Sequence, residues 1–101
     1  MAAYFIARVN VTDWNKFKNY LDASPSVLKM FGGTYIARGG EIVTLEGPEE
    51  QRRVVLVEFP TLEQAKEFYN SSEYQEVIKL RKDAAIAEII VVDGIKQSQF
   101  L

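Results

Sequence analysis

The chain has 101 residues, a formal net charge of −2 and neither cysteine nor histidine. The length fits a single domain, and the slight acidic excess argues against nucleic-acid binding, which depends on a basic surface. Without cysteine and histidine there are no disulfides, no thiol or histidine-activated nucleophiles and no histidine-bound zinc, iron or haem.

The first third of the chain predicts a strand followed by a long helix. Residues 3–11 are rich in aromatic and β-branched side chains, which favours a strand. Residues 12–13 supply an N-cap, and apolar residues then recur at near-helical spacing. Pro25 should kink or split this helix, with Ser24 capping its second part. The glycine pair at 32–33 should end it.

The middle of the chain predicts two further strands. Residues 34–38 and 41–46 resemble one strand that is interrupted by two glycines at 39–40, where either a bulge or a tight turn would fit. A turn follows at 47–50. Residues 52–59 then have the clearest strand pattern of the sequence, and a proline ends it.

The last third predicts helix and then strand. A capping box at 61–64 starts a helix, and the same pattern at 72–75 starts a second, shorter one. Residues 84–93 form the last strand. The order strand–helix–strand–strand–helix–strand predicts one α+β domain over residues 1–94, with a C-terminal tail at 95–101.

The strands are apolar on both faces, which predicts a homodimer. Residues 52–59, like the first and last strands, do not alternate between apolar and polar side chains as a sheet with one wet face should. Two helices cover only one face, so a second copy is the simplest cover for the other. The alternative is that the tail and helix ends cover it. Arg8 and Glu88 are lone charges on these strands, predicted to pair across the sheet or across the dimer.

No apolar run approaches the ~20 residues that a membrane helix requires. The N-terminus also lacks the basic start and apolar stretch of a signal peptide, so we expect a cytoplasmic protein without a membrane partner.

Short motifs spread along the chain carry a resemblance to a known family. They are Gly32-Gly33-Thr34-Tyr35, Arg38-Gly39-Gly40, Glu46-Gly47, Arg53, Glu58-Phe59-Pro60, Ala65, the stretch 68–75 and Arg81. In this order they resemble DUF1330, an uncharacterised bacterial family of the dimeric α/β-barrel superfamily. The resemblance implies a ferredoxin-like βαββαβ fold with an antiparallel four-stranded sheet and helices on one face. It also implies two sheets packed into a barrel and a pocket between helices and sheet in each subunit.

The resemblance implies no reaction. Relatives in the wider superfamily include cofactor-free monooxygenases, muconolactone isomerases and haem-binding enzymes, and a shared fold says little about function.

Carboxylates, arginines and tyrosines are the remaining candidates for chemistry. Glu58 shares a strand face with Val54 and Leu56, where a charge without a partner is costly. A buried carboxylate takes up a proton readily, which suits a general base. The alternative is a strand-end carboxylate that pairs with an arginine or caps the next helix. Arg38 could present its guanidinium to a ligand carboxylate, or form a salt bridge, for example with Glu58.

Further candidates lie on the predicted helices. Arg81 and Tyr74 are seven residues apart, which places them on one helical face, where they could line a pocket mouth. The alternative is a solvent-facing arginine and a packed tyrosine. Tyr20 and Tyr69 are predicted to be core or pocket wall.

Three functions stay open. The first is a cofactor-independent enzyme that abstracts a proton from, or isomerises, a small carboxylate or phenolic compound. Glu58 would be its base, Arg38 and Arg81 its anion clamps and Tyr74 a hydrogen-bond donor or stacking wall. The second is a non-catalytic protein that binds a small ligand in the same pocket, and the third is a structural dimer module. No cofactor or metal is expected, because no acidic cluster has metal-ligand spacing. No nucleic acid is expected either, because the third strand lacks an aromatic platform.

Overall fold

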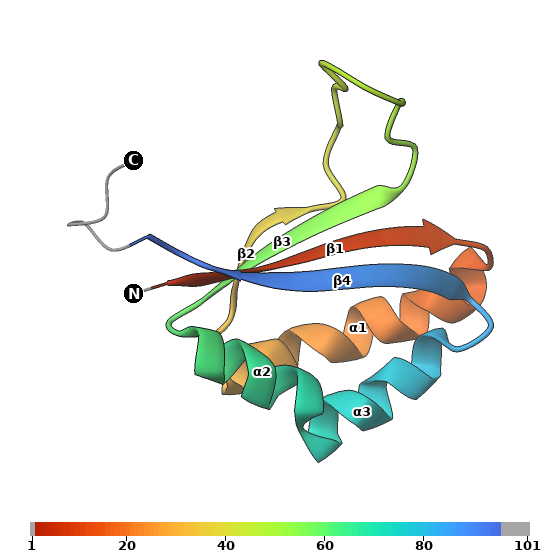
Figure 1. Cartoon of the computed structure of the whole chain (residues 1–101). Coiled ribbons are helices and arrows are strands. Elements are labelled where there is room, and N and C mark those ends of the chain that lie inside the picture. Colours follow the sequence, from red (N-terminus) through yellow and green to blue (C-terminus); the bar gives the residue numbers. More distant parts are fainter. Residues whose placement is uncertain (1, 96–101) are drawn as a thin grey trace.

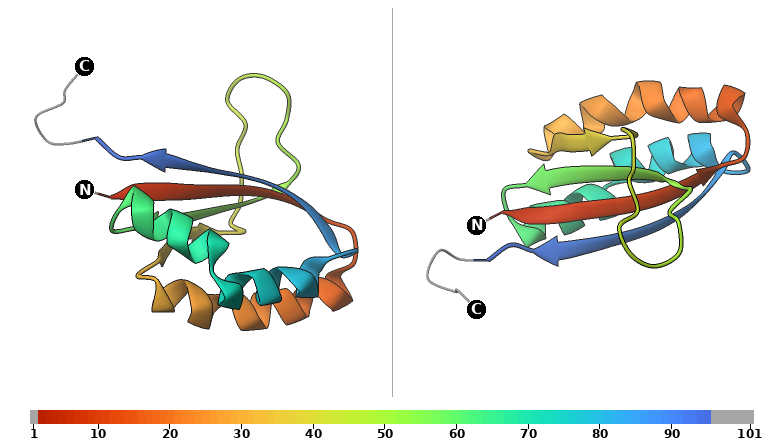
Figure 2. Two further views of the ribbon diagram at one scale, coloured as in Figure 1. Left: turned by 60° about the horizontal axis from the view of Figure 1, so that its bottom comes forward. Right: turned by 90° about the horizontal axis from the view of Figure 1, so that it is seen from above.

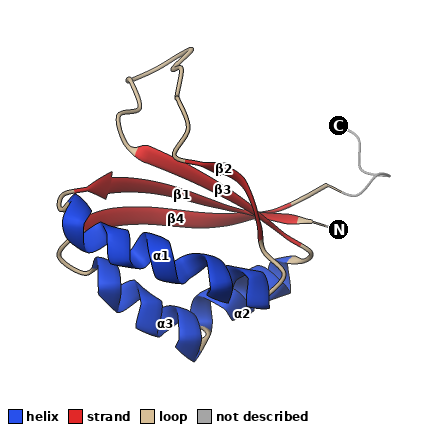
Figure 3. Cartoon of the chain, turned by 180° about the vertical axis from the view of Figure 1, so that it is seen from behind, coloured by secondary structure: helices blue, strands red, loops and turns tan. Residues whose placement is uncertain are grey.

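The computed structural model describes residues 2–95 as an antiparallel four-stranded sheet with helices on one face (Figures 1 and 3). The elements in chain order are β1 (Ala3–Val11), α1 (Trp14–Met30), β2 (Thr34–Arg38), β3 (Arg53–Phe59), α2 (Leu62–Asn70), α3 (Ser72–Ile78), the 3-10 turn η1 (Lys79–Arg81) and β4 (Ala85–Asp93). The strand order β2-β3-β1-β4 is that of the ferredoxin-like fold, which confirms the predicted class. Most of the predicted tail, residues 96–101, lies outside the described residues. In the described part, no helix is long and apolar enough to span a membrane.

The long helix α1 runs through Pro25 without being split. Asp13 caps its start, and the chain turns at Gly32 with a φ of 83°, so both predicted ends are confirmed. The predicted split is wrong, since residues on both sides of Pro25 pack against the sheet and hold a single helix. Ser24 is not a cap. It is buried, and its hydroxyl lies 3.4 Å from that of Tyr35 on β2.

The predicted strand at 41–46 is also wrong. Strand β2 ends at Arg38, and residues 39–52 form a loop, here called the arm, which stands off the sheet on the side away from the helices (Figures 1 and 2). Gly39, with a φ of 72°, turns the chain out of the ladder. A bulge between Tyr35 and Ala37 precedes it. The arm exposes apolar side chains, most of all Leu45 at 91%.

Serine and threonine caps start the two short helices. The Thr61 hydroxyl accepts from the Gln64 N–H at 3.1 Å, as predicted for α2. Helix α3 begins slightly earlier than predicted, because the Ser71 hydroxyl accepts from the Tyr74 N–H at 3.1 Å. The chain continues through η1 to Arg81, so the predicted short helix is present as two joined pieces.

The two faces of the sheet differ in what covers them. The helix-covered face holds the core, in which Phe68 contacts the rings of Phe5, Phe59 and Tyr74. The opposite side, here called the open face, carries the alternate residues of each strand. Its exposed apolar side chains include Ile36, Ile86, Ile90 and Val92.

Candidate ligand site

A cavity lies between α1 and the helix-covered face of the sheet. Its volume is about 40 Å³, which is room for about three water molecules. Its walls are mostly apolar and aromatic. The polar groups in the lining are three arginines, three tyrosines and one serine: Arg38, Arg53, Arg81, Tyr20, Tyr35, Tyr74 and Ser24. No aspartate or glutamate among the described residues lines it, so the cavity is cationic and rich in hydrogen-bond donors.

Two tyrosines and one arginine form one side of the cavity. The Tyr20 and Tyr74 hydroxyls are hydrogen-bonded to each other at 2.5 Å, and the Arg81 guanidinium lies 5.3 Å from the centroid of the Tyr20 ring. Burial raises the pKa of Tyr20, and the contact with Tyr74 raises it further. Burial also raises the pKa of Tyr74, against the opposing effects of its hydrogen bond to Tyr20 and of the Arg81 charge. Both hydroxyls are therefore protonated at neutral pH, and because one donates to the other, the pair has one O–H left to donate.

A pair of arginines comes from the adjacent strands β2 and β3. Arg38, the last residue of β2, donates from Nη2 to the Leu21 carbonyl of α1 at 2.9 Å. Its guanidinium lies 4.6 Å from the centroid of the Tyr35 ring. Arg53 is the first residue of β3, and its side chain is on the same face of the sheet. The pair therefore brings two positive charges to the cavity wall.

Arg53 is partly buried without a partner. Its Nε atom is inaccessible to solvent and has no hydrogen-bond acceptor among residues 2–95. Burial lowers the pKa of Arg53, and the positive charge of Arg38 lowers it further. Gly39 leaves room for the guanidinium, since a Cβ at that position would collide with it. The guanidinium of Arg53 thus lies against Gly39, and the described part of the chain leaves its charge without an acidic partner.

Sequence reasoning did not include Arg53 among the site residues, although a signal was present. Arg53 belongs to the same alternating series as Val55 and Val57, both of which face the helices. A charge in that series should have been noted as a candidate for the pocket. Ser24 was also missed, because it was interpreted as a helix cap.

Four of the predicted site residues lie together. Arg38, Arg81, Tyr20 and Tyr74 all line the cavity. Tyr69 does not. It is exposed on α2, where it borders an open groove beside β4, and its ring centroid is 5.8 Å from that of Tyr74. What each of these residues does stays a prediction.

Glu58 is separated from the others by the sheet. It lies on the open face, opposite Tyr4 of β1 and Thr34 of β2. Within the described residues it takes part in no ion pair, so the predicted pairing with Arg38 is not observed. Thr61 caps α2, which leaves no capping role for Glu58. Its role as a base stays a prediction.

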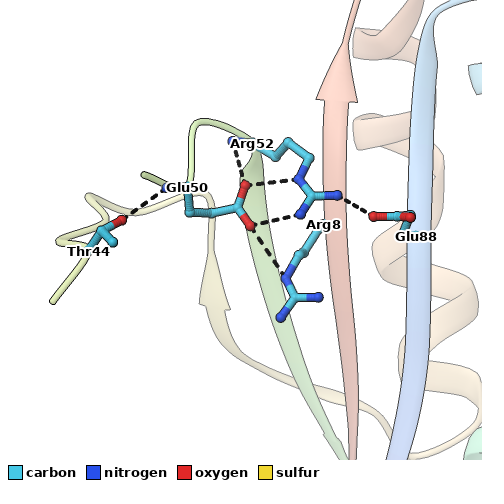
Figure 4. A network of polar contacts seen from close by, with 5 residues as sticks. All are labelled: Arg8, Thr44, Glu50, Arg52 and Glu88. Carbon is cyan, nitrogen blue, oxygen red and sulfur yellow. Dashed lines mark hydrogen bonds and ion pairs between the residues drawn. The ribbon is translucent and has the colours of Figure 1, made fainter. Parts of the chain in front are cut away.

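A network of four charged residues ties the arm to the open face (Figure 4). The Glu50 carboxylate accepts from Arg52 at 2.9 Å and pairs with Arg8 of β1 at 3.4 Å, while Arg52 also pairs with Glu88 of β4. Hydrogen bonds from Arg52 hold the pKa of Glu50 at about 2. Arg8 and Glu88 are opposite each other in the sheet, as predicted, but they are joined through the arm rather than directly. In residues 2–95 no cluster of acidic side chains suits a metal ion.

Comparison with known proteins places the chain among proteins of unknown function. The family model described as "Domain of unknown function (DUF1330)" matches residues 2–95. No curated protein sequence gives a significant match. A protein of unknown function from Rhodopseudomonas palustris has a similar structure, with a TM-score of 0.74 and 21% identity over 94% of this chain and 83% of that chain.

Two more distant structures share the fold. SnoaB from Streptomyces nogalater, described as a cofactor-independent oxygenase, has a TM-score of 0.67 at 8% identity, with 96% of each chain covered. A protein from Bacteroides fragilis, described as dimeric, of unknown function and with a ferredoxin-like fold, has a TM-score of 0.62 at 13% identity over 92% of this chain and 96% of that chain. At these identities the likeness shows the fold alone.

Proposed function

Because the chain belongs to the DUF1330 family, for which no function is established, we propose a function from the cavity itself. The protein binds a small molecule that bears a carboxylate or a phenolic group, between α1 and the sheet. The observation that carries this proposal is the composition of the lining, which combines three arginines with a protonated tyrosine pair and has no acidic residue within residues 2–95. A few convergent polar groups on apolar walls are typical of small-molecule sites.

The cavity must widen to admit a ligand larger than a few atoms. A space of about 40 Å³ is far below the ~150 Å³ that holds benzene. Arg38 is the side chain that we expect to move when the cavity opens. It is exposed and donates one hydrogen bond, to the Leu21 carbonyl. Rotation of this side chain would open the cavity at the end of β2.

The working unit of this proposal is a homodimer that pairs two open faces. Exposed Ile86 and Ile90 on that face, with Leu45 of the arm, form apolar surface that a second copy would remove from water. The structural neighbour from Bacteroides fragilis, described as dimeric, supports a dimer.

Native mass spectrometry of gently purified protein tests both the bound small molecule and the homodimer. We expect two chains plus a small mass that is lost on denaturation. Arg81→Met should reduce the retained mass, whereas Lys82→Met, which removes a charge from the neighbouring exposed residue, should not. A bare monomer that takes up no small carboxylate or phenol would contradict the proposal.

A cofactor-independent enzyme is the second candidate. It is supported by the structural likeness to SnoaB, which is described as a cofactor-independent oxygenase. Among the described residues the cavity supplies cations and donors but no base, and Glu58 lies on the other face of the sheet, so Glu58 could abstract a proton only from a substrate bound on that face. Glu58→Gln should then abolish turnover of a small carboxylate or phenol and leave the fold intact. Unchanged turnover would remove Glu58 from the mechanism.

A further inference from the structure

The arginines of this protein fall into two groups with different partners. On the open face, Arg8 and Arg52 share the carboxylate of Glu50. In the cavity, Arg38 and Arg53 lie close enough for one charge to lower the pKa of the other, and no carboxylate among the described residues pairs with either. Two like charges side by side beneath a helix are unfavourable unless something offsets them.

The surroundings of Arg38 and Arg53 indicate where a negatively charged partner would lie. The Nε of Arg53 is buried without an acceptor, while Arg38 is held beside it by the Leu21 carbonyl and the Tyr35 ring. Gly39 supplies the space that the Arg53 guanidinium occupies. A negatively charged group in the cavity would pair with the two guanidinium groups and offset the repulsion between them.

We infer that Arg38 and Arg53 form a carboxylate-binding site, so that the ligand of the cavity is a small carboxylic acid. The inference rests on the proposed function and decides between its two ligand classes. A carboxylate is planar and offers two acceptor oxygens, which matches guanidinium donors in shape and charge. The cavity of about 40 Å³ has room for such a head group, and its apolar walls would contact the carbon chain once the cavity has widened.

The tyrosine pair gives the other side of the cavity a different chemistry. The protonated hydroxyls of Tyr20 and Tyr74 bond to each other, which leaves one O–H of the pair free to donate, and Arg81 lies beside the Tyr20 ring. They suit a neutral acceptor, such as a carbonyl or hydroxyl oxygen. In this assignment Arg53, rather than Arg81, is the main anchor for the acid.

Thermal denaturation and calorimetric titration at constant ionic strength test the assignment. The probes are acetate, propanoate and benzoate, each beside its neutral amide, and inorganic phosphate. We expect saturable stabilisation by at least one carboxylate and at least tenfold weaker binding of the matching amide. Arg53→Met and Arg38→Met should each weaken carboxylate binding at least tenfold. Lys18→Met removes an exposed charge outside the cavity and should change nothing.

A second pair of variants acts on Arg53 through the backbone. Gly39 and Gly47 both have positive φ, so alanine is strained at either position, but only at Gly39 would its Cβ collide with Arg53. Gly39→Ala should therefore lose carboxylate binding, and Gly47→Ala should keep it. Wild-type affinity in folded Gly39→Ala would overturn the role of Arg53.

The possible results distinguish the carboxylate site from the small-molecule cavity on which it depends. Equal binding of acids and amides, or binding of phosphate alone, would overturn the carboxylate site and leave a small-molecule cavity in place. Binding of no probe at all, together with native spectra that show no retained mass, would overturn both.

Discussion

The two faces of the sheet differ in whether their arginines have acidic partners. Each face carries two arginines from β-strand or arm positions. On the open face, Arg8 and Arg52 are neutralised by Glu50 and Glu88 (Figure 4). On the helix-covered face, Arg38 and Arg53 have no acidic partner among residues 2–95.

This difference separates a structural role from a ligand-binding one. Exposed ion pairs contribute little individually, but the open-face network joins the arm to β1 and β4 and so fixes where a long loop stands. Of the two unpaired arginines, Arg53 lies where desolvation makes a charge unfavourable. A group that costs stability without a partner points to a partner that comes from outside the chain.

Neighbouring residues of β4 give the largest expected contrast. Val91 faces the helices and Ile90 faces outward, so the same substitution can be placed on either face. Val91→Asp should lower the free energy of unfolding by roughly 3 kcal/mol, because an unpaired carboxylate replaces a packed side chain. Ile90→Asp should keep the helical circular dichroism signal and instead shift the protein from dimer to monomer. Urea melts and analytical ultracentrifugation measure the two effects.

The comparison of faces would fail if the two variants behaved alike. A dimeric Ile90→Asp protein would show that a second copy does not cover the open face. A Val91→Asp protein of wild-type stability would show that the helix-covered face is less tightly packed than the structure has it.

The second-largest effect is expected at high pH, where two tyrosines of the helix-covered face should lower the free energy of unfolding. Tyr20 and Tyr74 have raised pKa values, so the unfolded chain loses their protons first, near pH 10. Their contribution to the free energy of unfolding is complete below pH 10 and is lost as the pH rises above it. The loss is about 1.4 kcal/mol per pH unit for each hydroxyl that stays protonated in the folded state. Urea melts from pH 8 to 11 measure the slope.

Tyrosine variants show whether residues of the helix-covered face cause the fall in the free energy of unfolding with rising pH. Tyr74→Phe should reduce this slope, because one of the two hydroxyls is removed, and should cost about 1 kcal/mol at neutral pH, because Tyr20 loses its hydrogen-bond partner. Tyr4→Phe, on the open face, is the matched control and should leave the slope unchanged. An equal change in both variants would show that the buried pair is not the cause.

Most of the fold could be predicted because it depends on local rules. Strand composition, the caps at Asp13 and Thr61 and the glycine pair after α1 each act within a few residues. The failures depended on tertiary contacts. Pro25 is tolerated because α1 packs along its whole length, and residues 41–46 have strand-like composition but no neighbouring strand to pair with.

The candidate site shows the same limit. Tyr74 and Arg81, which seven-residue spacing put on one helical face, both line the cavity, and that spacing is a local feature of the sequence. Glu58 and Arg38 were assigned to one site although they belong to opposite faces. The bulge in β2 changes the alternation of that strand, and the sequence did not reveal its position. Arg53 could have been found from the alternation of β3 alone.

Acid should produce the smallest effect, and on the open face only. The pKa of Glu50 is lowered to about 2 from an ordinary value of 4.5, so its contribution to the free energy of unfolding is complete above pH 4.5 and is lost as the pH falls towards 2. Other carboxylates titrate in the same range, so the informative quantity is the difference in unfolding free energy between wild type and Glu50→Gln. It should be largest at neutral pH, shrink below pH 4.5 and decrease with added salt, which screens exposed pairs.

Glu49 is the matched control, because it is an exposed glutamate beside Glu50 that takes no part in the network. Glu49→Gln should be indistinguishable from wild type at every pH. Limited proteolysis gives a second readout, since Glu50→Gln should expose the arm to cleavage at neutral pH while the carboxylate response of the cavity stays intact. If neutralising Glu50 instead weakened binding in the cavity, the arm would be coupled to the site through the sheet. The separation of the two faces into a structural one and a binding one would then be wrong.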